Sequence, residues 1–224
     1  LEMFYKGFNE VRDDFYDGMI ITGAPVEMMD FEEVSYWEEI KSIFEWARTH
    51  VTSTLYICWA SQAALYHFYG VDKSPLDEKL FGVFKHTATE KRHPLFRGFD
   101  DEFFIPHSRH TTILKSSIAE KAQISVLSES EDAGLAILSS RGGREFYFTG
   151  HSEYAPLTLS DEYKRDLEKG VSIRMPLNYY VDNNPNNPPL VRWTSHANLL
   201  FNNWLNYFVY QETPFDLKDV PQLG

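Results

Sequence analysis

The only cysteine of this 224-residue chain, Cys58, lies where a strand-like segment gives way to a helical one. The segment from Thr52 to Ile57 is β-rich, and the segment from Trp59 to Tyr69 has Ala, Gln and Leu at helical spacing before it stops at Gly70. At such a turn a cysteine sulfur is exposed near a helix N-terminus, whose dipole and free N–H groups stabilise a thiolate. We therefore predict that Cys58 is a nucleophile that carries an acyl group as a thioester. Composition alone leaves the alternative of a small, inert, buried hydrophobic residue.

A cysteine nucleophile needs a base, and His151 is the candidate. It follows a predicted strand in the string Gly150-His151-Ser152-Glu153, where the carboxylate two residues on could fix the tautomer of the imidazole. Neighbouring backbone N–H groups, including that of Trp59, could hold the oxyanion of a tetrahedral intermediate. Taken alone, the His-x-Glu pattern also suits a structural histidine, so the prediction depends on the pairing of Cys58 with His151.

Other polar residues invite weaker hypotheses. The string His107-Ser108-Arg109-His110 places two histidines three residues apart, but no cysteine or third histidine completes a tetrahedral metal site, and we predict no metal. Four basic side chains could bind a carboxylate or phosphate, or could be solvated surface: Lys79, Arg97, Arg109 and Arg165.

Composition excludes several classes of protein. The formal net charge of −12 argues against a nucleic-acid partner, and no apolar run is long enough to predict a membrane span. A Gly-rich phosphate loop, a Gly-x-Ser-x-Gly motif and a dinucleotide fingerprint are all missing from the sequence. One cysteine cannot form an intramolecular disulfide, so we expect a soluble protein of a reducing compartment, the cytoplasm. No signal peptide is visible behind Leu1.

The elements that must position these groups alternate between strands and helices, which predicts an α/β layered fold in one domain, residues 1–224, with ligands at the carboxyl ends of strands. Predicted strands are 19–22, closed by a turn at Gly23-Ala24-Pro25, then 52–57, 135–140 and 145–149, the last two forming a hairpin. Predicted helices are 31–47 with Asp30 as N-cap, 59–69, 159–169 and 195–210. The aromatic face of the last helix predicts core or a subunit contact. We expect short strands and loops in 79–109 and irregular backbone in 182–189.

Longer strings resemble the homoserine O-acyltransferases of methionine biosynthesis, also called homoserine transsuccinylases. The resemblance runs through almost the whole chain and is carried by five strings: Ile21-Thr22-Gly23-Ala24-Pro25, His50-Val51-Thr52-Ser53-Thr54, Arg97-Gly98-Phe99-Asp100-Asp101, Pro106-His107-Ser108-Arg109 and Asn198-Leu199-Leu200-Phe201. The family pattern Gly-His-Pro-Glu-Tyr has Ser152 in place of proline here, and Ala60-Ser61 replaces a commoner small pair. Neither change removes a reacting group.

This resemblance implies a flavodoxin-like fold similar to class I glutamine amidotransferases, with a mostly parallel sheet flanked by helices. It implies a catalytic triad of Cys58, His151 and Glu153, and substrate contacts from Lys79, Ser108 and Arg165, with Arg165 suited to the homoserine carboxylate. It also implies a homodimer, acetyl-CoA as a co-substrate without further cofactors, and a longer N-terminal segment before Leu1.

The acyl donor is implied by one further residue. In the family that this chain resembles, glycine two positions after Gly-Ala-Pro accompanies the use of succinyl-CoA, and glutamate there accompanies the use of acetyl-CoA. In this chain that residue is Glu27. A carboxylate in the acyl pocket fills space and repels the terminal carboxylate of a succinyl group. The resemblance therefore favours a homoserine O-acetyltransferase that uses L-homoserine. Three alternatives stay open: a succinyltransferase in which Glu27 is an ordinary acid, a glutamine hydrolase, although that group has glycine where this chain has Ala60, and a non-catalytic binding module.

Overall fold

A single seven-stranded sheet organises the chain in the computed structural model, which describes residues 5–214. The strands, in their order across the sheet, are β1 (Tyr16–Ile21), β2 (Val51–Ile57), β7 (Glu145–Phe148), β6 (Gly134–Ser140), β5 (Ile124–Ser130), β3 (Ser74–Ala88) and β4 (Phe103–Thr112). The α-helices are α1 (Phe8–Val11), α2 (Trp37–His50), α3 (Trp59–Tyr69), α4 (Lys115–Ile118), α5 (Thr158–Glu168) and α6 (Thr194–Trp204), and α6 continues as a π-helix over Leu205–Tyr210. Short 3₁₀ turns cover Phe31–Glu33, Pro94–Phe96, Arg141–Gly143 and Val181–Asn183.

The α/β class is confirmed, and the sheet is mixed. Parallel pairing is confined to β1, β2 and β7, whereas β6, β5, β3 and β4 extend the sheet through antiparallel pairs. The predicted hairpin of β6 and β7 is confirmed, and it is the point at which the direction changes. Its short turn contains Gly142 and Gly143, both with positive φ, and a connection of this length can join only antiparallel strands. The parallel part of the sheet is therefore narrower than expected.

The prediction for 79–109 was wrong about the strands, which are long and not short, whereas 89–102 is a connection with one 3₁₀ turn, as expected. The region contributes most of β3 and β4, which pair over most of their lengths and bulge between Pro75 and Leu80. The alternation of apolar and polar residues fails here because β4 buries His107 and Arg109, each at most 1% exposed. Histidine and arginine usually face solvent, so their place on the buried face of β4 hides the alternation of apolar and polar residues that predicts a strand.

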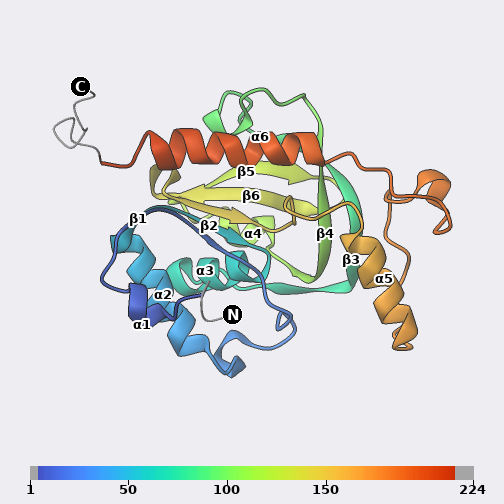
Figure 1. Ribbon diagram of the computed structural model, residues 1–224, viewed down its shortest axis with the longest axis horizontal. Coiled ribbons are helices and arrows are strands. Elements are labelled where there is room, and N and C mark those ends of the chain that lie inside the picture. The colour runs from blue at the N-terminus through green and yellow to red at the C-terminus, as the bar shows by residue number, and fades with distance from the viewer. Residues whose placement is uncertain (1–4, 215–224) are drawn as a thin grey trace.

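Helices cover both faces of the sheet (Figure 1). Helices α2 and α3 lie on one face, where Phe44 and Tyr56 belong to the same buried cluster. Helix α6 lies on the other face, where Leu200 and Trp204 belong to a second buried cluster with Leu55. The aromatic C-terminal helix is thus core, as predicted. The helix predicted from Asp30 begins later: Asp30 precedes only a 3₁₀ turn, since Val34 has extended backbone, and α2 starts at Trp37.

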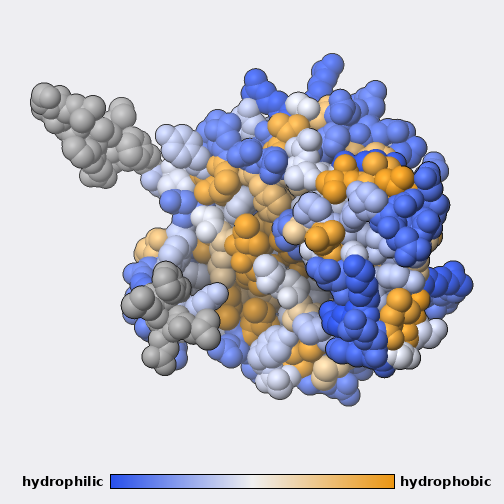
Figure 2. Space-filling model, turned by 45° about the vertical axis from the view of Figure 1, so that its right-hand side comes forward, coloured by the Kyte–Doolittle hydropathy of each residue, from blue (hydrophilic) through white to orange (hydrophobic). Residues whose placement is uncertain are grey.

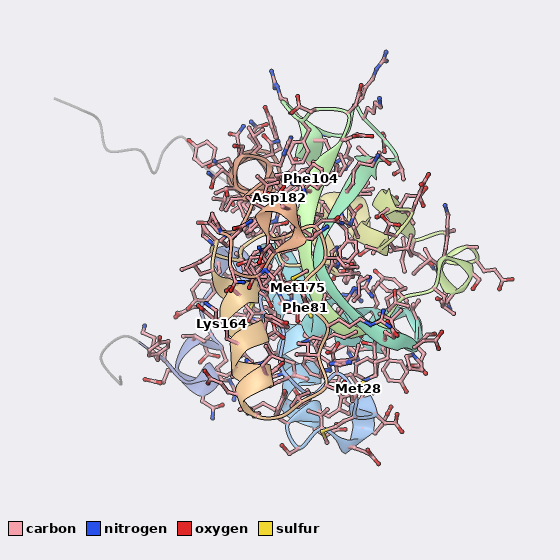
Figure 3. All side chains as sticks on the ribbon, turned by 90° about the vertical axis from the view of Figure 1, so that its right-hand side faces the viewer. Met28, Phe81, Phe104, Lys164, Met175 and Asp182 are labelled. Atoms are coloured by element: carbon pink, nitrogen blue, oxygen red, sulfur yellow. The ribbon has the colours of Figure 1, made fainter. Side chains whose placement is uncertain are left out.

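A third buried cluster lies between α5, β3 and the segment that follows α5. Figure 3 shows Phe81 and Met175 close together beside α5; Phe81 belongs to this cluster, and Met175 packs against it. Segment 171–180 is tied to β3 because the Val83 N–H donates to the Leu177 carbonyl and the Leu177 N–H donates to the Phe81 carbonyl, each at 2.9 Å. Helix α5 is thereby fixed beside the C-terminal ends of the parallel strands.

The surface is mainly polar. Figure 2 shows hydrophilic residues over much of the visible face, with smaller hydrophobic areas between them, in keeping with the net charge of −12. Within residues 5–214, the structure contains no helix with the length and apolar character needed to traverse a lipid bilayer.

Candidate active site

The turn between β2 and α3 holds Cys58 in a sharp, strained conformation. Its backbone φ of 54° and ψ of −118° is rare for a residue with a side chain, and such strain persists only where the surroundings enforce it. The Cys58 N–H donates to the Phe148 carbonyl at 2.7 Å, and the Cys58 carbonyl accepts from the Ser61 hydroxyl at 2.7 Å and N–H at 3.0 Å. The expected turn from strand to helix at Cys58 is therefore present. The residue is 7% exposed and lines a cavity.

His151 stands at the end of β7 beside Cys58. Its Nδ1 hydrogen-bonds to Glu153 Oε1 at 2.7 Å, which leaves Nε2 for the thiol, and its ring stacks on Tyr154 with centroids 4.2 Å apart. Burial alone would lower the pKa of His151, but hydrogen bonds to Cys58 and Glu153 outweigh it and raise the pKa to about 10. The three residues predicted as a triad thus meet in space, and the contacts of His151 favour its imidazolium form.

Gly150 sets the position of His151. The His151 N–H donates to the Pro106 carbonyl of β4 at 2.8 Å, which draws Gly150 against that strand. A Cβ on residue 150 would lie 2.6 Å from Ile105 Cγ2 and 2.7 Å from His107 Cε1. Only glycine allows this approach.

We expect Gly150→Ala to displace His151 from Cys58. Overpacking of a buried site of this kind costs about 1–3 kcal/mol of unfolding free energy, and a shift of about 1 Å at a catalytic group costs about 100-fold in rate. Urea unfolding and alkylation of Cys58 at neutral pH would measure the two effects. Gly7→Ala is the matched control, because Gly7 has an ordinary φ of −72° and its Cβ would lie 3.4 Å from Glu10 Oε2, which is a normal contact distance. Equal behaviour of the two variants would contradict this account.

Backbone N–H groups for an oxyanion lie beside the sulfur. Trp59 is the first residue of α3, where the N–H has no helical acceptor, and this is the donor predicted from the sequence. Gly23 of the β1 loop packs against it, since a Cβ at Gly23 would lie 3.0 Å from Cys58 Cβ and 3.4 Å from Trp59 N. The loop Gly23-Ala24-Pro25, at a strand end that we predicted to face a ligand, thus packs beside Cys58.

A cavity of about 570 Å³ connects all the residues predicted for the site. Cys58 and His151 line it, and the loop after β1 forms a wall that includes Glu27. Its remaining wall comes from β3, β4 and α5 and includes the predicted binding residues Lys79, Ser108 and Arg165. Residues more than 130 positions apart in the sequence therefore face one space.

Two carboxylates in this cavity were missed from the sequence, Glu162 and Asp166 on α5. Glu162 Oε1 accepts from Lys79 Nζ at 2.6 Å and from the Ser108 hydroxyl at 2.8 Å. Asp166 Oδ1 pairs with the Arg165 guanidinium at 2.7 Å. The spacing of Glu162, Arg165 and Asp166 along a predicted helix was the available signal, because residues three and four apart share a face. The cationic binding residues are thus already paired.

Glu27 is anchored to β4. Its Oε2 accepts from the His110 N–H at 3.0 Å and lies 3.5 Å from the Thr111 hydroxyl. These contacts hold the carboxylate at the wall of the cavity that contains Cys58, which is where a carboxylate must lie if it is to act on an acyl group.

Other residues singled out from the sequence lie elsewhere. Arg97 donates to the Tyr207 hydroxyl at 2.6 Å, away from the cavity, and Arg109 is buried in the interior. His107 and His110 do not form a pair, since His107 is fully buried while His110 lines the cavity. Among the described residues no cluster of three or more His, Cys, Asp or Glu has the arrangement of a metal site.

Comparison of the fold with solved structures confirms the expected architecture. A glutamine amidotransferase from Thermotoga maritima superposes with a TM-score of 0.59 at 16% identity, over 85% of this chain and 78% of that one. A glutamine amidotransferase from Methylobacillus flagellatus gives a TM-score of 0.61 at 12% identity, over 85% of this chain and 76% of that one. At such identities the likeness shows the fold alone.

Sequence comparison shows the family. A protein of Parabacteroides distasonis named homoserine O-acetyltransferase is 64% identical over 224 residues, which are 100% of this chain and 72% of that protein. A Bacteroides fragilis protein of the same name is 62% identical over 220 residues, 98% of this chain and 72% of that protein. The model of the homoserine O-succinyltransferase family matches residues 1–215. The chain therefore belongs to the homoserine O-succinyltransferase family of acyltransferases.

Proposed function

We propose that this protein is a homoserine O-acetyltransferase that transfers the acetyl group of acetyl-CoA to the hydroxyl of L-homoserine. The observation that carries the proposal is the meeting of Cys58, His151, Glu153 and Glu27 in one cavity. The relatives named homoserine O-acetyltransferase, at 64% and 62% identity, support the same reaction. Methionine biosynthesis in the cytoplasm follows as its setting. A homodimer, the single-domain division and the lack of any further cofactor stay predictions.

The first half-reaction uses the charge state of the resting site. Cys58 thiolate attacks the thioester carbonyl of acetyl-CoA, and the Trp59 N–H and its neighbours stabilise the oxyanion. Collapse of the intermediate breaks the bond to the CoA sulfur, which leaves as a thiol after taking the proton of the His151 imidazolium. The product is acetyl-Cys58 beside a neutral His151.

The second half-reaction depends on the loss of that thiolate. Once Cys58 is acylated, it no longer holds His151 in the charged form, so the imidazole is free to act as a base. His151 then takes the proton of the homoserine hydroxyl, and the oxygen attacks the acetyl carbonyl. Cys58 leaves as a thiolate, and O-acetyl-L-homoserine is released. Glu153 keeps Nδ1 protonated throughout, so that Nε2 faces the reacting groups.

The α5 wall offers complementary charges to an amino acid. Arg165 is suited to a carboxylate through a bidentate pair, and Glu162 is suited to an ammonium group. In the structure these side chains pair with Asp166 and Lys79, respectively. The carboxylate and ammonium groups of homoserine would replace Asp166 and Lys79 as the partners of Arg165 and Glu162. Because the substrate brings one charge of each sign, the net charge of the site would not change, and a substrate that carries both groups would be selected.

An adjoining cavity of about 550 Å³ extends the site toward the surface. It shares Met28, Lys79, His110 and Asp166 with the cavity around Cys58 and is also lined by Phe81. Met28 and Phe81 mark it in Figure 3. Space of this kind suits a donor whose acyl group is carried on a long arm.

We predict that acetyl-CoA supplied without homoserine leaves one acetyl group on Cys58, which intact-mass spectrometry followed by peptide mapping would detect. Cys58→Ala is the control and should show no adduct. Wild-type protein that releases no CoA thiol and gains no acetyl group would contradict the proposal. The second candidate, a succinyltransferase, rests on the name of the matching family model. A succinyl adduct that forms faster than the acetyl adduct at equal donor concentration would favour it.

A further inference from the structure

Arg109 is a buried cation whose hydrogen bonds all go to neutral acceptors. It lies on the inner face of β4 and is 1% exposed. Its guanidinium donates to the Thr111 carbonyl and the Ala133 carbonyl, each at 2.6 Å, and its Nε–H donates to His107 Nδ1 at 3.3 Å. None of these acceptors is a carboxylate. A buried charge is retained in a fold only where something compensates it.

The two buried histidines next to Arg109 must be neutral and have defined tautomers. A guanidinium can only donate, so His107 Nδ1 accepts and the proton of His107 is on Nε2. His107 Nε2 lies 3.2 Å from His86 Nε2, which must therefore accept, and His86 Nδ1–H donates to the Phe84 carbonyl at 2.9 Å. Burial lowers the pKa of His86 to about 4 and that of His107 well below its ordinary value. This series of hydrogen bonds thus ends at the neutral Phe84 carbonyl, and the positive charge stays on Arg109.

Arg109 is connected to the nucleophile turn through Gln62, which lies in the first turn of α3. The Thr111 carbonyl accepts both from Arg109 and from the Gln62 amide, the latter at 3.4 Å. The Thr111 hydroxyl also donates to Gln62 Oε1 at 2.8 Å, and the Gln62 N–H donates to the Cys58 carbonyl at 3.3 Å. The guanidinium is therefore held at a fixed position relative to Cys58.

The charges that act on Arg109 come from the active site. Burial lowers the pKa of Arg109 to about 10, and the anionic forms of Cys58 and Glu27 oppose that decrease. Arg109 is thus still charged at neutral pH. The titratable groups around Cys58 and Arg109 are His151, Glu153 and Tyr154 after β7, Glu27 after β1, His107 on β4 and His86 on β3.

We propose that Arg109 is a positioning residue for acyl transfer, which acts through Cys58 by placing a permanent positive charge beneath the nucleophile turn and so favours the thiolate independently of His151. The proposal rests on the proposed function, because it assigns a role within the same site. His151 must change its charge during the reaction, whereas a guanidinium cannot lose its proton in the same step. Arg109 would therefore stabilise the Cys58 thiolate both when it attacks and when it leaves.

The pH dependence of Cys58 alkylation by iodoacetamide tests this role without requiring acyl transfer. In Arg109→Gln we expect the midpoint pH of alkylation to rise by about one unit, which makes the reaction about tenfold slower below the midpoint while the high-pH rate is unchanged. Arg109→Lys, which keeps the charge, should recover most of the shift. A solely structural role would not be rescued by charge alone. Arg48→Gln is the matched control, since it removes a guanidinium that pairs with Glu145 at the opposite end of β7.

An unchanged midpoint in a folded Arg109→Gln protein would overturn the proposal. If that variant does not fold, alkylation of His151→Ala decides, because Arg109 is intact there and the base is absent. We expect its thiol to titrate below the ordinary value of about 8.5, and a midpoint at or above that value would overturn the proposal. The expected alkylation profiles with no acetyl adduct in the wild type would instead defeat the proposed function, and only the effect of Arg109 on the Cys58 thiolate would remain.

Discussion

His151→Asn is expected to lower kcat about 10³- to 10⁴-fold, because the variant loses both the cation that stabilises the Cys58 thiolate and the base that activates homoserine. Its Nδ1 partner Glu153 lies 2.7 Å away, so the histidine is oriented as well as charged. Steady-state kinetics with acetyl-CoA and homoserine would measure the loss. Glu153→Gln is the graded control: it keeps the imidazole but removes one cause of its raised pKa, and should lose less activity than His151→Asn.

His151→Asn should also change how the stability of the protein depends on pH. The folded-state pKa of His151 is about 10, which is above its ordinary value. The positive charge on His151 therefore stabilises the fold fully below about pH 6.5, and this contribution is lost as the pH rises through about 10. The difference in melting temperature between wild type and His151→Asn should therefore narrow between pH 7 and pH 10. A gap that stays constant from pH 7 to pH 10 would show that His151 is already neutral in the resting protein, and the imidazolium state would have to be abandoned.

Glu27→Gly is expected to change the choice of acyl donor. A carboxylate beside the terminal carboxylate of a succinyl group costs about 3 kcal/mol at an effective dielectric constant of about 20, so its removal should raise kcat/KM for succinyl-CoA about 100-fold. The acetyl donor carries no such charge and should lose only the support that Glu27 gives to β4 through the His110 N–H.

Glu27→Gln separates the two causes of discrimination. It keeps nearly the same volume but removes the charge, so a gain for succinyl-CoA in both variants would assign the effect to repulsion, and a gain in Glu27→Gly alone would assign it to space. Paired assays with both donors at equal concentration would give the answer. If neither variant changes the ratio of kcat/KM for the two donors, Glu27 does not determine the donor.

Much of the site was visible in the sequence because its parts are local. The β-rich run, the cysteine and the helix that ends at Gly70 are consecutive, and local backbone preferences are enough to predict a turn between them. The structure has β2, Cys58 and α3 at the expected residues, and Gly70 ends the helix in a left-handed conformation. The hairpin before His151 was predicted for the same reason, since its glycines mark a tight turn.

Other features were beyond the reach of pattern alone. The full lengths of β3 and β4 were not recognised because His107 and Arg109 face the interior. Buried hydrogen bonds to neighbouring residues, and not water, satisfy these polar side chains. The pairing of Glu162 with Lys79 joins residues 83 positions apart and depends on α5 packing beside β3. The helix expected at Asp30 starts only at Trp37, since a 3₁₀ turn and the extended Val34 come first.

The sequence by itself determined which residues could react: one cysteine, a His-x-Glu string and a glutamate in the loop after the first strand. Only the tertiary structure decided what state they are in. The pKa of His151 is raised because Cys58 and Glu153, on different segments, converge on one buried ring, and burial removes the water that would otherwise screen them. Charge interactions between distant segments depend on distance and dielectric environment, and neither quantity exists until the chain has folded.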